Sequence, residues 1–132
     1  MESPEQDAAP EQDPASEQDP AVDVSQRISD EIATIHRESY GEAVEAIETH
    51  ILDNVVICVL DVNLLPHERT LLEHGRGEDS IRKVRKEFQE SIGATFAAAV
   101  EHMTGRRVIA FLSETHIDPS FSVEFFRLAP RE

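Results

Sequence analysis

The sequence predicts an α+β domain in which an antiparallel four-stranded sheet is packed by one long and two shorter helices. Two observations lead to this fold class. Apolar residues at helical spacing mark three segments, whereas apolar and β-branched residues are concentrated in two pairs of short runs. A short turn signal separates the runs of each pair, so each pair is antiparallel. The predicted order of elements is α-β-β-α-α-β-β.

The first 23 residues differ in composition from the rest of the chain. The tripeptide EQD recurs at 5–7, 11–13 and 17–19 with prolines between, and the segment holds eight acidic and no basic residues. Such a segment buries too little apolar surface to offset the entropy lost on ordering. We therefore predict a disordered acidic leader over 1–23 and a single folded domain over 24–132.

The first half of the domain reads as a helix followed by a hairpin. The helix has apolar residues at steps of three and four and ends at Gly41. Asp53-Asn54 then interrupts two β-rich runs and suits the positive φ values of a two-residue turn. The second run, 55–60, is apolar on both sides, which predicts a central strand covered on both faces. The helix is defined by Val24, Ile28, Ile32 and Ile35.

The second half reads as two helices followed by two strands. Pro66 opens a short helix, since the first turn needs no N–H from that residue. A longer helix is predicted from about Asp79 to Thr104, and Gly105 ends it. The runs RVIAFLSE and FSVEFFRL are predicted strands. The buried side of the short helix is assigned to Leu64, Leu65, Leu71 and Leu72, and the stripe of the long helix to Ile81, Val84, Phe88, Ile92, Phe96, Val100 and Met103.

Charge and cysteine content limit the class of protein. The chain has 27 acidic and 12 basic residues, a formal net charge of −15, which argues against binding to nucleic acid or anionic lipid. A single cysteine, Cys58, fits a reducing compartment. The longest apolar run is far shorter than the roughly 20 residues that cross a bilayer. We expect a cytoplasmic protein, with no nucleic-acid partner and no direct membrane insertion.

A basic cluster within residues 82–86 stands out in this acidic chain and allows two interpretations. Acid and base four positions apart stabilise a helix, so one interpretation is an ordinary salt-bridged, solvated face. Arg85 and Arg76 lack such an acidic partner, and with Arg82 they are the candidates for contact with a protein partner. The predicted local pairs are Glu78–Arg82, Asp79–Lys83 and Lys86–Glu90.

A possible cation site lies near the end of the third predicted strand. Glu114, His116 and Asp118 alternate and, in an extended chain, project to the same side. They could bind a cation or hold a protonated histidine, or they form a polar strand end that leads into a turn at Asp118-Pro119. Nucleophilic and phosphate-binding motifs are missing from the sequence, and Cys58 sits in the most apolar run, so we expect a non-catalytic protein without a cofactor.

Several of these segments together resemble the MpsC family of short bacterial domains. The similarity is carried by ISDEIATIHRESYG (28–41), ERTLLEHGRGEDSIRKVRKEFQ (68–89) and AAAVEHMTGRRVIAFLSETHIDPSFSVEFFRL (97–128), and it spans about residues 24–129. The matching residues include 68–72, Gly75, Arg82, Arg85, Phe88, Glu101, Thr104, Gly105 and Val108. The chain departs from the family pattern at 41–46 and at 64–66.

The resemblance implies a link to a cation-translocating, membrane-potential-generating system, without catalytic residues to carry over. It favours an accessory or regulatory protein that docks to a membrane ion-transport subunit at the inner face of the membrane. Two alternatives stay open. One is a free cytosolic homodimeric interaction or stress-regulatory module, formed through the sheet or the long helix. The other is a small metal- or ligand-binding protein that uses Glu114, His116 and Asp118.

Overall fold

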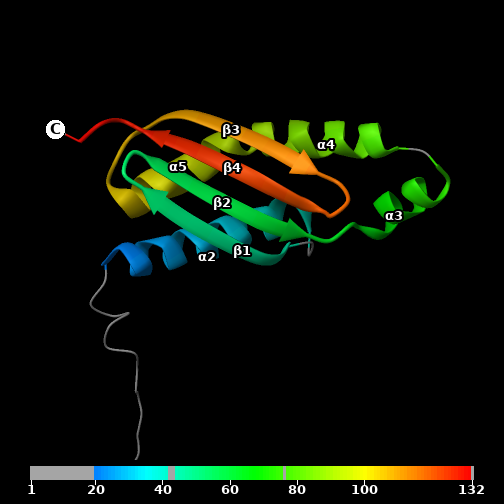
Figure 1. Ribbon diagram of the computed structural model, residues 1–132, viewed down its shortest axis with the longest axis horizontal. Coiled ribbons are helices and arrows are strands. Elements are labelled where there is room, and N and C mark those ends of the chain that lie inside the picture. Colours follow the sequence, from blue (N-terminus) through cyan, green and yellow to red (C-terminus); the bar gives the residue numbers. More distant parts are fainter. Residues whose placement is uncertain (1–19, 42–43, 76, 132) are drawn as a thin grey trace, which may run out of the picture.

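The computed structural model describes residues 20–41, 44–75 and 77–131 (Figure 1). It confirms the α+β class, the antiparallel four-stranded sheet and the predicted order of elements, with the long helix divided into two. The helices are α2 (Pro20–Tyr40), α3 (Pro66–Glu73), α4 (Glu78–Ser91) and α5 (Gly93–Thr104), and the strands are β1 (Val44–Leu52), β2 (Val55–Val62), β3 (Val108–His116) and β4 (Phe121–Leu128).

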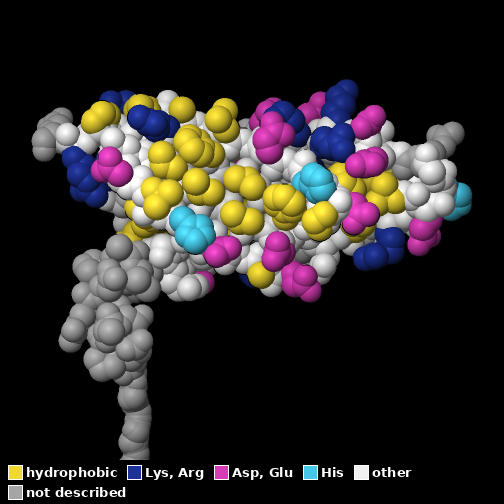
Figure 2. All heavy atoms as spheres, in the orientation of Figure 1, with side chains coloured by type: hydrophobic (Ala, Val, Ile, Leu, Met, Phe, Trp, Pro, Cys, Tyr) yellow, Lys and Arg dark blue, Asp and Glu magenta, His cyan; other side chains and the backbone are white. Residues whose placement is uncertain are grey.

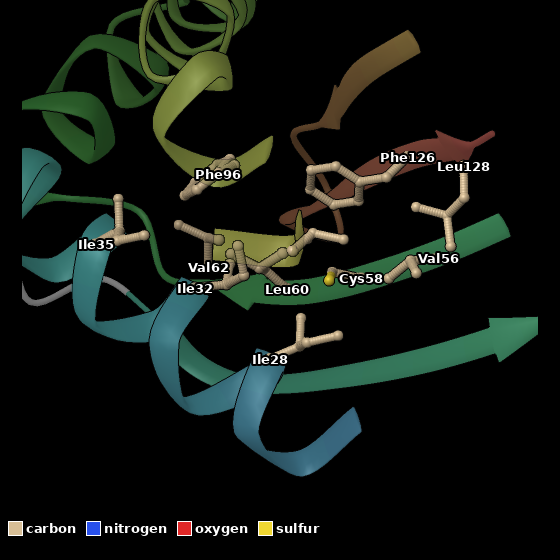
Figure 3. Close-up of a cluster of buried hydrophobic side chains, with 11 residues drawn as sticks. Ile28, Ile32, Ile35, Val56, Cys58, Leu60, Val62, Phe96, Phe126 and Leu128 are labelled. Atoms are coloured by element: carbon tan, nitrogen blue, oxygen red, sulfur yellow. The ribbon is translucent and has the colours of Figure 1, made fainter. Parts of the chain in front are cut away.

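The sheet has the order β1-β2-β4-β3, and the helices that pack on it cover one of its two faces (Figure 1). Helix α2 packs against β1, while α4 and α5 pack against β3. The core lies between these layers, where α2 and α5 meet the inward residues of β2 and β4 (Figure 3). Its fully or nearly buried members are Ile28, Ile32, Ile35, Val56, Cys58, Leu60, Val62, Phe96, Val100, Phe126 and Leu128.

The prediction that β2 is covered on both faces is wrong. Residues alternate in burial along the strand, because successive side chains point to opposite faces of a sheet. The inward residues at 56, 58, 60 and 62 are buried beneath the helices. The outward residues Val55, Ile57 and Val59 stay partly exposed. Both sides of the strand are apolar, but the helices cover only one of them.

Local signals place most element ends where the sequence predicts them. Asp53 has the predicted positive φ, 49°, between β1 and β2, and Gly105 caps α5 with a φ of 70°. Helix α2 begins at Pro20, earlier than the predicted start near Val24. Most of the predicted leader, residues 1–19, lies outside the described residues.

The predicted long helix bends at Ile92 and Gly93, which separate α4 from α5. Backbone hydrogen bonds continue through the bend, from the Ile92 amide to Phe88 and from the Phe96 amide to Ile92. At Gly93 the helix lies so close to the sheet that an added Cβ would stand 2.8 Å from the ring of Phe111. A glycine at this position therefore allows the close approach of helix and strand.

Replacing Gly93 with alanine is expected to destabilise the protein by about 1–3 kcal/mol, because overpacking forces neighbouring groups to move. The Phe111 ring has little room to move, since it packs against Phe96 and Phe126. Chemical denaturation measures the effect, and Ala98→Gly on the exposed side of α5 reports helix propensity alone, about 1 kcal/mol. A Gly93→Ala variant more stable than the parent would show that the contact does not limit packing.

The predicted buried side of the middle helices is confirmed at Ile81 and wrong at several other positions. Helix α4 buries Ile81, Arg85 and Gln89, and Val84 of the predicted stripe is 56% exposed. Likewise, the buried residue of α3 is Glu68, whereas Leu71 is 40% exposed. Both errors have the same cause, because polar residues that bond to one another are buried here in place of nearby apolar residues. In α5 the prediction holds for Phe96 and Val100.

Candidate functional site

A buried ion pair between Arg85 and Glu68 joins α4 to α3. The two side chains are 2% and 4% exposed. Arg85 binds the carboxylate through two parallel hydrogen bonds, 2.7 Å from Nη2 to Oε1 and 3.1 Å from Nε to Oε2. This bidentate geometry is the strongest arrangement that an arginine and a carboxylate form. The pair therefore fixes the position of α3 relative to α4.

The remaining polar atoms of this ion pair also have partners. Glu68 accepts hydrogen bonds from the Tyr40 hydroxyl and from the Leu65 amide, so each carboxylate oxygen has two donors. Arg85 donates further bonds to the Asn63 carbonyl and to the Ser120 hydroxyl, at 3.2 and 3.0 Å. A buried ion pair is tolerated when its hydrogen-bonding capacity is met in this way.

The ion pair shifts the pKa values around it. Burial alone would raise the pKa of Glu68, but the hydrogen bonds from Arg85 and Tyr40 outweigh it and leave the pKa below its usual value. Burial and the bond to Glu68 raise the pKa of Tyr40 to about 12. Burial, together with the nearby Arg85, lowers the pKa of His36 to about 4. At neutral pH the cluster thus holds one ion pair and a neutral histidine.

The three arginines predicted to contact a partner do not form one surface. Arg85 is buried, so the structure contradicts its assignment to an exposed patch. Arg76 lies outside the described residues. Arg82 is at the surface and is held by Glu78 at 3.0 Å and by Asp79 at 2.9 Å.

The predicted salt-bridged face of α4 is present with one change of partner. Asp79 binds Arg82, not Lys83 as predicted. Lys86 pairs with Glu90 as predicted, at 3.5 Å, and additionally with Glu114 of β3 at 3.1 Å. The cluster therefore links α4 to the edge of the sheet.

Two of the three residues of the predicted cation site, Glu114 and His116, make contacts within the chain. Glu114 is paired with Lys86, and His116 Nδ1 donates a 2.8 Å hydrogen bond to the carbonyl of Pro119. Asp118 lies exposed in the turn that follows β3, where the Asp118–Pro119 bond is cis. No group of three potential metal-ligating side chains is found in the part of the chain that the structure describes.

A row of polar residues that the sequence reasoning missed crosses the covered face of the sheet. Register places Thr49, Cys58, Glu124 and Ser113 side by side on β1, β2, β4 and β3. Glu124 is fully buried, and neither carboxylate oxygen has a hydrogen-bond partner among the described residues. Burial raises the pKa of Glu124 to about 7 and the pKa of the Cys58 thiol to about 12. This thiol is a core group, as predicted.

The face of the sheet turned away from the helices, the outer sheet face, is open and largely apolar. Figure 2 shows hydrophobic side chains gathered over the strands on this side. Leu52 and Leu112, at its two edges, are 59% and 63% exposed. Register defines four rows across β1-β2-β4-β3: Leu52, Val55, Arg127 and Ala110; His50, Ile57, Phe125 and Leu112; Glu48, Val59, Val123 and Glu114; and Ala46, Asp61, Phe121 and His116.

Comparison with known proteins yields one assignment. Comparisons with curated proteins and with solved structures find no significant match. Among the described residues, none of the helices has the length and apolar character needed to span a membrane. A family model described as "Na+-translocating membrane potential-generating system (MpsC)" matches residues 22–130. Because this match covers most of the chain, including the whole sheet, the chain belongs to the MpsC family.

Proposed function

We propose that this chain is a non-catalytic accessory or regulatory component of a Na+-translocating, membrane-potential-generating system, and that it joins membrane-embedded subunits through protein contacts. Membership in the MpsC family supports the assignment to this system. The distribution of ionisable and apolar side chains supports the accessory role. The strongly shifted ionisable groups, such as Glu124 and His36, are buried in the core, whereas apolar side chains are exposed on the surface. Among the described residues, this arrangement supports a role in binding.

Crosslinking of the full chain in its native cells, followed by membrane fractionation, tests this role. We expect the chain to be recovered with a multi-pass subunit of the ion-translocating system. Arg82→Glu should lower this recovery, since Arg82 is the candidate contact residue that the structure places at the surface. Arg107→Glu, an exposed arginine outside the basic cluster, serves as the matched control. Recovery without any membrane protein would contradict the proposal.

A second candidate is a homodimeric regulatory module that works without a membrane partner. The open outer sheet face favours it, because a face of this kind can pack against its own copy. The same fractionation separates the two candidates: a dimer that brings down no membrane protein would support this module.

A further inference from the structure

We propose that the outer sheet face is the interface between two copies of this chain, related by a two-fold axis that runs across the strands. This rests on the second candidate function and deepens it, because it gives the face and the symmetry axis of the contact between copies. The two sheets would pack face to face, about 10 Å apart, as in a β-sandwich. The helices of each copy would then form the two outer layers.

The size and composition of the outer sheet face fit such a contact. Four strands over seven residues have a footprint of about 450 Å² on each copy, so the contact would bury about 900 Å² in total, the size of a small and weak protein interface. The central strands supply aliphatic and aromatic side chains, and the exposed Leu52 and Leu112 extend the apolar surface to both edges. Lys86 holds Glu114 at the edge of β3, so that this carboxylate is engaged on the side of α4.

The proposed two-fold axis brings opposite charges on the outer sheet faces of the two copies close together. An axis across the strands places the first row of one copy over the fourth row of the other, and the second row over the third. Arg127 of the first row then lies beside Asp61 of the other copy, one strand away. The Arg127–Asp61 pair occurs twice, whereas His50 and Glu48 are already paired within each chain at 3.2 Å and add no charge pair of their own.

A two-fold axis parallel to the strands fits less well. It would place β1 over β3 and β2 over β4, because the strand order is β1-β2-β4-β3. Arg127 of the first row and Asp61 of the fourth row would then lie at opposite ends of the contact, so their pairing would be lost. Glu48, paired with His50, would lie over Glu114, paired with Lys86, and no opposite charge would face either carboxylate across the contact. Like charges brought together at an interface oppose association, which matters in a chain with a net charge of −15. The distribution of charge therefore selects the axis across the strands.

Analytical ultracentrifugation of the full chain tests the proposal. The parent is expected to form a dimer, and Ile57→Lys is expected to raise its dissociation constant at least about 100-fold by burying an unpaired charge at the centre of the contact. Circular dichroism checks that the variant is folded. Val84→Lys, at an exposed apolar residue of α4, is the matched control and should leave the dimer unchanged. A monomeric parent, or a dimer lost in Val84→Lys and kept in folded Ile57→Lys, would overturn the proposal.

Exchanging the charges of Asp61 and Arg127 tests the direction of the axis independently of the Ile57→Lys variant. Asp61→Arg and Arg127→Asp are each expected to weaken the dimer about tenfold, and the double variant should return to within about threefold of the parent. Additive weakening in the double variant would refute this axis. The result is independent of the proposed function, because a dimer can form with or without a membrane partner, and recovery with a membrane subunit can occur with or without a dimer.

Discussion

The Arg85→Met variant is expected to lose about 3–5 kcal/mol of unfolding free energy, since removing one partner leaves the other charge buried and uncompensated. Glu68 would keep its bonds from Tyr40 and the Leu65 amide but lose both bonds from the guanidinium. Arg85 also bonds to the loop after β2, at Asn63, and to Ser120 before β4, so the connections of α3 and the sheet weaken together.

Chemical denaturation at two pH values gives this prediction a specific signature. Protonation neutralises Glu68, so the loss caused by Arg85→Met should be smaller at acid pH than at neutral pH. Adding Glu68→Gln to Arg85→Met should restore part of the lost stability at neutral pH, because it removes the buried charge. Equal losses at both pH values, with additive single effects, would mean that the ion pair is not coupled.

Arg82 provides the matched control on the same helix. It lies three residues before Arg85 and also has two hydrogen bonds to acidic side chains. Its partners are largely exposed, and exposed ion pairs contribute little because solvent screens them. Arg82→Ala is therefore expected to cost less than about 1 kcal/mol. A comparable loss from both arginines would show that burial does not distinguish them.

The comparison of these two arginines shows where sequence reasoning succeeds and fails. The pairs Glu78–Arg82 and Lys86–Glu90 are local on a helix, and spacing alone predicts them. Arg85 binds a residue 17 positions away, and no periodic pattern reports such a contact. Its one signal in the sequence was the lack of an acidic residue four positions away. That signal was interpreted as surface exposure, because most arginines are exposed.

Element ends were predictable for a related reason, since backbone geometry at single residues sets them. Pro66 begins α3, Asp53 adopts a positive φ in the first hairpin, and Gly105 ends α5. The bend at Gly93 was not predicted, because its cause is the Phe111 ring on another element. Motif residues of the family resemblance, such as Glu68 and Arg85, are buried in an ion pair, and a motif match alone does not separate packing from binding.

Burial on the sheet was the least predictable feature. Both sides of 121–128 contain apolar residues, so alternation alone does not tell which side meets the helices. The side that contains Ser122 and Glu124 is the buried one, and the side with Phe121, Val123 and Phe125 is the open one. Apolar residues on both sides of a strand predict that both sides are buried. The sequence of one chain does not tell which side the helices cover and which side is left open.

Between pH 4.5 and about pH 8, the stability of Glu124→Gln relative to the parent is expected to grow by about 3 kcal/mol in favour of the variant. Burial raises the pKa of Glu124 in the folded protein from its usual 4.5 to about 7. The folded parent therefore keeps a proton that the unfolded chain releases, and its stability falls as the pH rises through this range. Glutamine stays neutral, so the variant lacks this loss.

His36 acts with the opposite sign, and the experiment must separate the two groups. Burial and Arg85 lower the pKa of His36 from 6.5 to about 4, so its contribution to stability is present above pH 6.5 and is lost as the pH falls toward 4. From pH 4.5 to 6.5 the two effects oppose each other in the parent. The stability of the parent alone can therefore change little with pH although both groups are strongly perturbed.

Subtracting the unfolding free energy of the parent from that of Glu124→Gln at each pH removes His36, which is the same in both proteins. Any fixed cost of burying the amide shifts this difference curve without changing its slope, because glutamine does not titrate. Glu87→Gln, at an exposed position of α4, controls for the loss of one negative charge. A difference curve for Glu124→Gln that is as flat as that of Glu87→Gln would mean that the buried carboxyl has a hydrogen-bond donor in solution, and that the polar row across the sheet is hydrated.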